Sequence, residues 1–164
     1  MSKALNISHD RLKEKLSYDP ETGIFVWKLP TKKIRVGDVC GTPHNAGYTI
    51  IRVDGHQYLA HRLAWFYMTG KFPPKFTDHI DGNRLNNKFS NLRLADAQMN
   101  VQNTRVARRM NKLGILGVYK NRNKFVARIW ENGNYHCLGS YSTTEEAKQA
   151  YINGKRIFHV GCTI

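Results

Sequence analysis

The chain is 164 residues long, which is enough for one ordinary domain or two small ones. Its hydrophobic share of 41% supports modest cores, and the sequence contains no long apolar run that would cross a membrane. The formal net charge of +14 favours a polyanionic partner, because each neutralised phosphate releases counterions. Charge alone also allows a soluble basic protein without such a partner.

The first hundred residues combine helical and strand-like patterns, as in α+β proteins. Ser8 is a capping residue for a short helix that we expect to end near Tyr18, and a turn then precedes a strand at 24–27. A hairpin is predicted over 48–59, turning at its Asp-Gly pair, and a helix over 61–69.

The rest of the chain shows two further patterns. Residues 76–103 read as strand, long loop, strand and helix, and a basic connector follows. In the last fifty residues, apolar and polar residues first alternate as they do in strands. A capping box at Thr143 and Glu146 then predicts the start of a final helix. We expect them to form a three-stranded antiparallel sheet packed on one helix. The predicted organisation is a domain at 1–103 with a motif core at 76–103, a linker at 104–113 and a second domain at 114–164.

Cysteine usage and the N-terminus indicate the compartment. Cys40, Cys137 and Cys162 lie far apart and form no Cys-x-x-Cys pair, so we expect free thiols and no structural zinc site. Residues 1–6 lack the charged-then-apolar pattern of a secretory signal, so a cytoplasmic location is expected.

One constellation in the first domain is specific. Asp78-His79 is followed by Asn91 and then by Asn100, and this order resembles the HNH (His-Me finger) nuclease motif with asparagine in place of the last histidine. The flanks resemble those of phage-type homing and free-standing HNH endonucleases. They comprise His61-Arg62-Leu63-Ala64-Trp65, Asp81-Gly82-Asn83, Asn86-Asn87, Asn91-Leu92-Arg93 and Tyr18-Asp19-Pro20-x-Thr22-Gly23-x-x-x-Trp27. The resemblance covers residues 11–103 and implies a ββα-metal core on an N-terminal α+β scaffold.

The chemistry of phosphodiester hydrolysis assigns roles to these residues. A neutral histidine can take a proton from water, so His79 is the predicted general base. A hard divalent cation held by oxygen ligands stabilises the phosphate and the leaving oxygen. Asp78 and Asn100 are the predicted ligands of one such ion, and two oxygen ligands favour Mg²⁺, or Mn²⁺, over zinc. The resemblance gives Asn91 a bracing role that orients His79.

Weaker candidates surround this set. Asn103 lies three residues after Asn100 on one helix face and is a candidate to support it. Arg84 and Arg93 are candidates for phosphate contact, with solvated surface arginine as the alternative. Adjacent residues on a regular strand point to opposite faces, so the strand carrying the Asp-His pair is expected to end or distort there. His61 is expected to pack at a helix start.

Residues 114–161 resemble a second family, the ethylene-response-factor type of DNA-binding domain, in which a sheet face enters the major groove. The matching residues are Gly117-Val118-Tyr119, Lys124-Phe125-x-Ala127-Arg128-Ile129, Leu138-Gly139-x-Tyr141-x-Thr143-x-Glu145-Glu146-Ala147 and Ala150-Tyr151. That family usually has an arginine before Gly-Val, where this chain has Leu116. One expected base contact is therefore missing.

Strand alternation predicts which side chains of this domain face DNA. Phe125, Ala127 and Ile129 are expected to pack on the helix. The predicted DNA-facing set is Tyr119 or Lys120, with Arg122, Lys124, Arg128, Trp130 and His136. The connector cations expected to follow the DNA backbone or minor groove are Arg105, Arg108, Arg109 and Lys112. The alternatives are a domain that binds protein or phosphates only, and a solvated linker.

Together these features predict an endonuclease that hydrolyses double-stranded DNA, of homing type or encoded by a phage, in the cytoplasm of the host cell. It is expected to act as a monomer or a transient dimer on DNA and not on membranes. One active site per chain cuts one strand, so a monomer is expected to nick. The alternative is a non-catalytic DNA-binding regulator that keeps the HNH fold.

Overall fold

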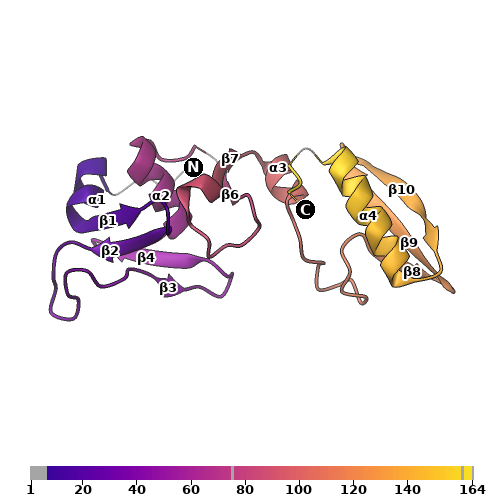
Figure 1. Ribbon diagram of the computed structural model, residues 1–164, viewed down its shortest axis with the longest axis horizontal. Helices are drawn as coiled ribbons and strands as arrows, with labels where there is room; N and C mark the ends of the chain where they lie inside the picture. Colours follow the sequence, from indigo (N-terminus) through magenta and orange to yellow (C-terminus); the bar gives the residue numbers. More distant parts are fainter. Residues whose placement is uncertain (1–6, 75, 160, 164) are drawn as a thin grey trace. The chain divides into compact units, whose positions relative to one another are not determined.

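The computed structural model of the chain describes residues 7–74, 76–159 and 161–163 (Figure 1). The chain divides into two compact units, Met1–Ala95 and Asp96–Ile164. The mixed α/β composition that the sequence predicts is confirmed. Residues 1–6, on which the expectation about a secretory signal rests, lie outside the described residues. Within the described ranges, none of the helices has both the length and the apolar character needed to span a bilayer.

The first unit consists of short elements joined by tight turns. In chain order they are α1 (His9–Lys15), β1 (Leu16–Asp19), β2 (Ile24–Trp27), β3 (Thr42–Pro43), β4 (Thr49–Val53), β5 (His56–Leu59), α2 (Ala60–Thr69), β6 (Phe76–His79), the 3₁₀ turn η1 (Phe89–Asn91) and β7 (Leu92–Ala95). The strands form three antiparallel sheets: β1-β2, β3-β4-β5 and β6-β7.

The first helix is shorter than expected. The Ser8 hydroxyl caps α1, and the helix ends where β1 begins, whereas the sequence predicted a helix to about Tyr18. Leu16 and Tyr18 instead alternate inward along β1 and are buried where it pairs with β2. The predicted hairpin over 48–59 is confirmed, and Asp54 and Gly55 both take the positive φ values that a two-residue turn of this kind needs.

A single apolar cluster holds the first unit together. Leu12, Leu16, Ile51 and Leu63 are almost completely buried in it, so it joins both helices to β1 and β4. The helix α2 ends at Gly70, whose left-handed conformation (φ 68°) stops it as the sequence predicts. This packing holds α2 against β4, β5 and β6, the elements around the candidate site.

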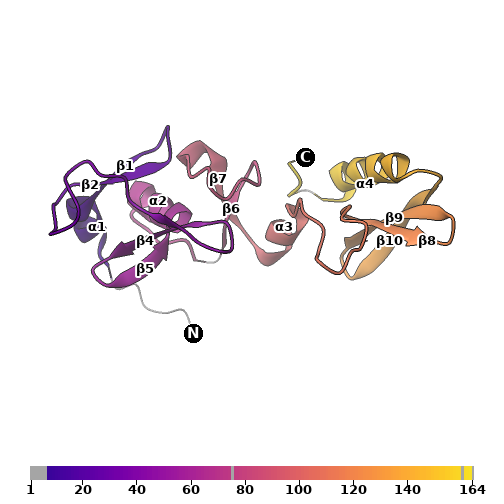
Figure 2. The ribbon, with the colours of Figure 1, turned by 90° about the horizontal axis from the view of Figure 1, so that it is seen from below.

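The second unit contains one short helix, a sheet and a long helix. They are α3 (Ala97–Gln102), β8 (Val118–Asn121), β9 (Lys124–Glu131), β10 (Asn134–Tyr141) and α4 (Thr144–Phe158). The sheet is antiparallel in the order β10-β9-β8, and α4 lies along one of its faces (Figure 2). Val118, Ala127 and Ile129 point to that face and are buried against Ala147 and Tyr151. The capping box of Thr143 and Glu146 is present at the start of α4.

The helix α3 belongs to the second unit, although we expected it to close a first domain that ends at residue 103. The Gly161 amide donates to Gln102 Oε1 at 3.1 Å, and Gln98 donates to Asn132 in the β9–β10 turn at 3.0 Å. The ammonium group of Lys155, a buried residue of α4, donates to the Thr104 carbonyl. These bonds tie the helix and its exit to the sheet unit.

Candidate functional site

The β6–β7 hairpin brings a carboxylate and a guanidinium together. Asp78 pairs in register with Arg93, and Asp78 Oδ2 accepts hydrogen bonds from Arg93 Nη2 at 2.9 Å and Nε at 3.2 Å. Asp78 is 8% exposed, so this ion pair is largely shielded from water. Arg93, a candidate for phosphate contact in the sequence analysis, thus has a carboxylate partner on the neighbouring strand.

His79 is the last residue of β6 and is buried, with 3% exposure. Its Nε2 lies 3.1 Å from Asn87 Oδ1. Asn87 Nδ2 donates to the Leu85 carbonyl, which fixes the amide so that its oxygen faces the imidazole. Nε2 therefore donates in this bond, and the neutral ring carries its lone pair on Nδ1.

The aromatic side chains of His61 and Tyr48 lie beside this imidazole. His61, at the start of α2, lies edge-on to His79 with 4.9 Å between ring centroids, and Tyr48 lies 5.2 Å from His61. Burial, with smaller contributions from His79 and Arg62, lowers the pKa of His61 to about 3. Burial also lowers the pKa of His79, although its bond to Asn87 and the nearby carboxylates act in the opposite direction. Both rings are therefore neutral at neutral pH.

Asn91 closes the loop between the two strands. Its Oδ1 accepts from the Asp81 amide at 3.0 Å, while its Nδ2 donates to Asp81 Oδ1 at 2.9 Å and to the Asn86 carbonyl at 2.8 Å. Its own carbonyl accepts from the Ile80 amide. Asn91 thus braces the residues that follow His79. Asn87, which the sequence analysis quoted in the motif without a role, contacts the His79 ring directly.

The β1–β2 turn supports the same loop from outside. The Tyr18 hydroxyl donates to the Asn87 carbonyl at 2.6 Å, and the Phe89 amide donates to the Pro20 carbonyl at 3.0 Å. Gly23 (φ 75°) packs so closely that a Cβ there would collide with the backbone of Asn87 and Lys88. The position of Asn87, and through it the His79 ring, is set by residues near the start of the chain.

Arg84, Asn100 and Asn103 are the remaining candidates that the sequence analysis named around the motif. The Arg84 guanidinium stacks over the Tyr48 ring at 4.8 Å and donates to the Ala46 carbonyl, while staying exposed. Asn100 is exposed on α3 in the second unit. Asn103 is the buried C-cap of α3, and its Oδ1 accepts from the Thr163 hydroxyl at 2.9 Å.

The donor chemistry of Asp78 and Asn100 fits a hard divalent cation, because carboxylate and amide oxygens are its preferred protein ligands. In the part of the chain that the structure describes, no group of three or more His, Cys, Asp or Glu residues could hold a metal ion.

A second candidate surface is the face of the sheet opposite α4. Tyr119 pairs with Val126 on this open face, and Arg128 and Trp130 alternate along β9 beside it. Tyr135 pairs with Trp130, and their rings meet at 4.6 Å. Of the two residues left open by the sequence, Tyr119 and not Lys120 shares the face of Arg128.

The expected position of His136 on that face is wrong. A two-residue turn at Asn132 and Gly133 pairs His136 with Ile129, and the His136 ring stacks on Phe158 of α4 at 4.8 Å. His136 therefore lies on the helix-covered side. The predicted turn over 131–134 and the observed turn both place Trp130 opposite Tyr135, so the register is as expected. The expectation failed because His136 is opposite Ile129, and directly opposed residues of an antiparallel pair share a face.

The other cations proposed for DNA contact are mostly exposed. Arg122 lies in the β8–β9 turn and Lys124 at the start of β9, and Arg108 and Arg109 lie in the connector. Arg105 differs from these because its guanidinium donates to both the carbonyl and the hydroxyl of Thr163.

Comparison with known proteins assigns a family to one segment of this chain. Residues 58–102 match the sequence model of the family described as HNH endonuclease. This segment includes α2, both strands of the β6–β7 hairpin and α3, and with them Asp78, His79, Asn91 and Asn100. Residues 58–102 are thus similar to HNH endonucleases.

Two curated relatives carry the same description. The chain is 36% identical over 107 residues to an uncharacterised HNH endonuclease of Acanthamoeba polyphaga mimivirus, covering 65% of this chain and 55% of that protein. It is 38% identical over 84 residues to a candidate HNH homing endonuclease, YosQ, from the SPbeta prophage of Bacillus subtilis (strain 168), covering 49% and 47%. The chain spans about half the length of the curated relatives it matches. No solved structure matches it.

Proposed function

We propose that this chain is a metal-dependent DNA endonuclease that hydrolyses phosphodiester bonds of double-stranded DNA. The observation that supports this most is the buried His79 at the end of β6, oriented by Asn87 and adjacent to Asp78, within the segment that matches the HNH family. A positioned neutral imidazole is suited to accept a proton from an attacking water.

In the proposed reaction, His79 Nδ1 takes the proton of the water whose oxygen attacks phosphorus, while the bond from phosphorus to the 3′-oxygen breaks. Asn87 keeps the proton of the neutral ring on Nε2, and Asn91 holds the loop that carries Asp81 in place. Asp78 and Asn100 would hold one divalent cation, Mg²⁺ or Mn²⁺, which supplies charge stabilisation at the phosphate and the leaving oxygen. In this proposal β6, β7 and α3 form the ββα-metal core.

We further propose that the exposed cations of the second unit attach the enzyme to its DNA by phosphate contacts. Arg108, Arg109, Arg122 and Lys124 are the residues that we expect to make them. A monomer with one such site is expected to nick duplex DNA. A homing or phage-related role is in keeping with the names of the relatives.

Incubation of the chain with supercoiled plasmid and Mg²⁺ or Mn²⁺ tests the proposal. We expect a relaxed, nicked product that EDTA prevents and that His79→Ala lowers by about 10²- to 10⁴-fold. His56→Ala, at an exposed histidine of β5, is the matched control and is expected to cleave normally. Failure of the wild type to cut with any divalent ion would contradict the proposal.

One observation favours the alternative of a non-catalytic DNA-binding regulator: Arg93 already bonds to the Asp78 carboxylate, where a cation would bind. Calorimetric titration with Mn²⁺ separates the two functions. A nuclease is expected to bind one ion that Asp78→Ala abolishes, and a regulator is expected to bind DNA equally well with and without the ion.

A further inference from the structure

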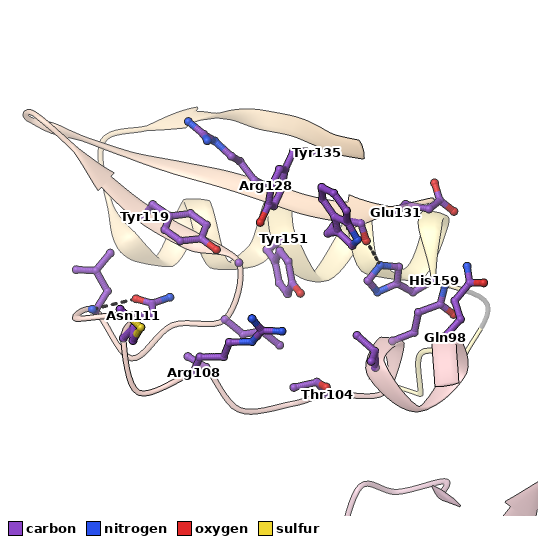
Figure 3. Close-up of a pocket in the computed structure, with 18 of the residues that line it drawn as sticks. Gln98, Thr104, Arg108, Asn111, Tyr119, Arg128, Glu131, Tyr135, Tyr151 and His159 are labelled. Atoms are coloured by element: carbon purple, nitrogen blue, oxygen red, sulfur yellow. Dashed lines mark hydrogen bonds between the residues drawn. The ribbon is translucent and has the colours of Figure 1, made fainter. Parts of the chain in front are cut away.

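A groove crosses the second unit between the chain segment 104–116 and the strands of the sheet. Its volume is about 1140 Å³. Figure 3 shows Arg108 on the segment at one side, with Tyr119 and Arg128 on the strands at the other. This hollow is somewhat larger than the clefts of about 300–1,000 Å³ that hold small ligands, so it has room for a length of polymer.

Hydrogen bonds and close packing hold the two walls. Asn111 Nδ2 donates to the carbonyls of Ile115, at 2.6 Å, and Val118, at 3.2 Å, and this fixes the segment where it enters β8. The Arg128 amide donates to the Gly117 carbonyl at 2.9 Å. Gly117, with φ 72°, lies directly against the Tyr151 ring, where no side chain would fit. The groove is thus a formed feature of this unit.

The charge of the groove selects an anionic occupant. Arg108 and Lys112 come from the segment, Lys120 and Arg128 come from the strands, and Glu131 is the acidic residue of the lining. The lining thus carries three net positive charges, which favour a chain of phosphates.

Aromatic side chains on the strand wall are available for stacking. Tyr119, Trp130 and Tyr135 are 46%, 50% and 64% exposed. Water contact with such large apolar surfaces is unfavourable, and stacking of a nucleic-acid base covers them at a gain that does not depend on which base it is.

We propose that this groove binds a single strand of DNA, with bases stacked on the rings of Trp130, Tyr135 and Tyr119 and phosphates paired with Arg108, Lys112 and Arg128. Duplex DNA offers a protein mainly the edges of its bases, whereas a separated strand offers their faces. A sheet that reads a duplex must project into the major groove. Here the sheet face that carries Tyr119, Arg128 and Trp130 forms one side of a hollow and does not project. The choice of DNA over other polyanions rests on the proposed nuclease function.

Fluorescence anisotropy with the full chain tests this proposal. The chain carries His79→Ala and is kept in EDTA, so binding is measured whether or not the protein cleaves. The probes are a fluorescein-labelled oligo(dT) of about 12 nucleotides, the same oligonucleotide with abasic sites, its ribonucleotide counterpart and the corresponding duplex. We expect oligo(dT) to bind at least about tenfold more tightly than the abasic probe, and more tightly than the duplex.

Variants locate the site. Trp130→Ala is expected to weaken oligo(dT) binding about tenfold, with partial recovery in Trp130→Phe, and Arg128→Ala to weaken it severalfold and reduce its salt dependence. Lys148→Ala and Ile157→Ala, exposed on α4 outside the groove, are the matched controls and are expected to bind normally. Because Trp130 is half exposed, its replacement is expected to leave the thermal unfolding temperature within a few degrees of that of the parent, on the order of 3 °C.

The inference would be overturned by tighter binding of the duplex, by equal binding of the abasic probe, or by equal losses in the α4 controls. Tighter binding of the ribonucleotide would assign the groove to RNA and would reject DNA. A chain that binds oligo(dT) but never nicks plasmid would keep the groove and reject the nuclease, so the two proposals fail independently.

Discussion

The candidate sites of the two units differ in how far their side chains are buried. In the first, Asp78, His79 and Asn87 are buried and each is fixed by a hydrogen bond to a neighbouring side chain. In the second, Trp130 and Tyr135 are at least half exposed. A site that moves a proton needs groups held at fixed distances, whereas a surface that attaches a flexible polymer needs reach and charge. The comparison predicts that changes in the first unit act through geometry and those in the second through affinity.

The largest effect is expected from Gly23→Ala, which disturbs the support of the first site. The new methyl group would meet the backbone of Asn87 and Lys88 and would also hold a side chain at φ 75°. We expect a loss of about 3 kcal/mol in unfolding free energy, measured by urea titration, together with lower activity.

Gly55→Ala is the matched control, because Gly55 has φ 80° but no neighbouring atom within 4 Å of the place that a Cβ would occupy. The Gly55→Ala variant has the backbone strain of a positive φ without the collision, so we expect a loss of about 1 kcal/mol in unfolding free energy. Equal losses in the two variants would show that the contact between Gly23 and Asn87 is unimportant.

The next largest effect is expected from substitutions of Asn87, which should lower the rate of the proposed reaction. Asn87→Ala removes the bond that orients His79 and is expected to lower kcat about 10- to 100-fold with little change in KM. Asn87→Asp places a negative charge beside the ring, which raises the pKa of His79 and moves the acidic limb of the pH–rate profile to higher pH. An unchanged profile in Asn87→Asp would contradict the assigned role.

A smaller effect concerns the pH dependence of stability. Burial lowers the pKa of both His61 and His79 in the folded chain, while unfolded histidine titrates near 6.5. Below about pH 6.5 the unfolded chain takes up protons that the folded chain does not, so stability declines as the pH falls.

Urea unfolding followed by tryptophan fluorescence between about pH 7.5 and pH 5 measures this slope, which we expect to be about 1 kcal/mol per pH unit. His44→Ala, at an exposed histidine, is expected to leave it unchanged. Higher stability at the acidic end would contradict the assignment of two neutral buried rings.

The smallest effects are expected for single exposed cations of the second unit. Arg122→Ala and Lys124→Ala each remove one proposed phosphate contact, so the logarithmic salt slope of DNA binding is expected to fall by about 1 in each variant. Cleavage of bound plasmid in single turnover is expected to stay normal. A loss of the single-turnover rate would show that these residues act on geometry after all.

Local features were predictable from the sequence because neighbouring residues determine them. The Asp54-Gly55 turn, the stop at Gly70 and the capping box of α4 each follow from residues within one turn of chain. The HNH segment was predictable because Asp78, His79 and Asn91 follow the order and spacing of that motif, and residues 58–102 match the family model.

Features that depend on register or on distant packing were missed. The ion pair of Asp78 with Arg93 depends on which residues face each other across β6 and β7. The face of His136 depends on its pairing with Ile129 across β9 and β10, and the extent of β1 depends on pairing with β2. The role of Asn87 required knowing where its amide points, and no local pattern distinguishes it from its neighbour Asn86.

The unit boundary after Ala95 has a consequence for how such proteins diversify. Recombination at this point would exchange the sheet unit together with α3, and Asn100 would travel with the incoming partner. Acquisition of a new target preference and inheritance of the proposed metal ligand would then be a single event. Lineages that exchange the second unit would therefore be selected for cleavage activity and for choice of target site at the same time.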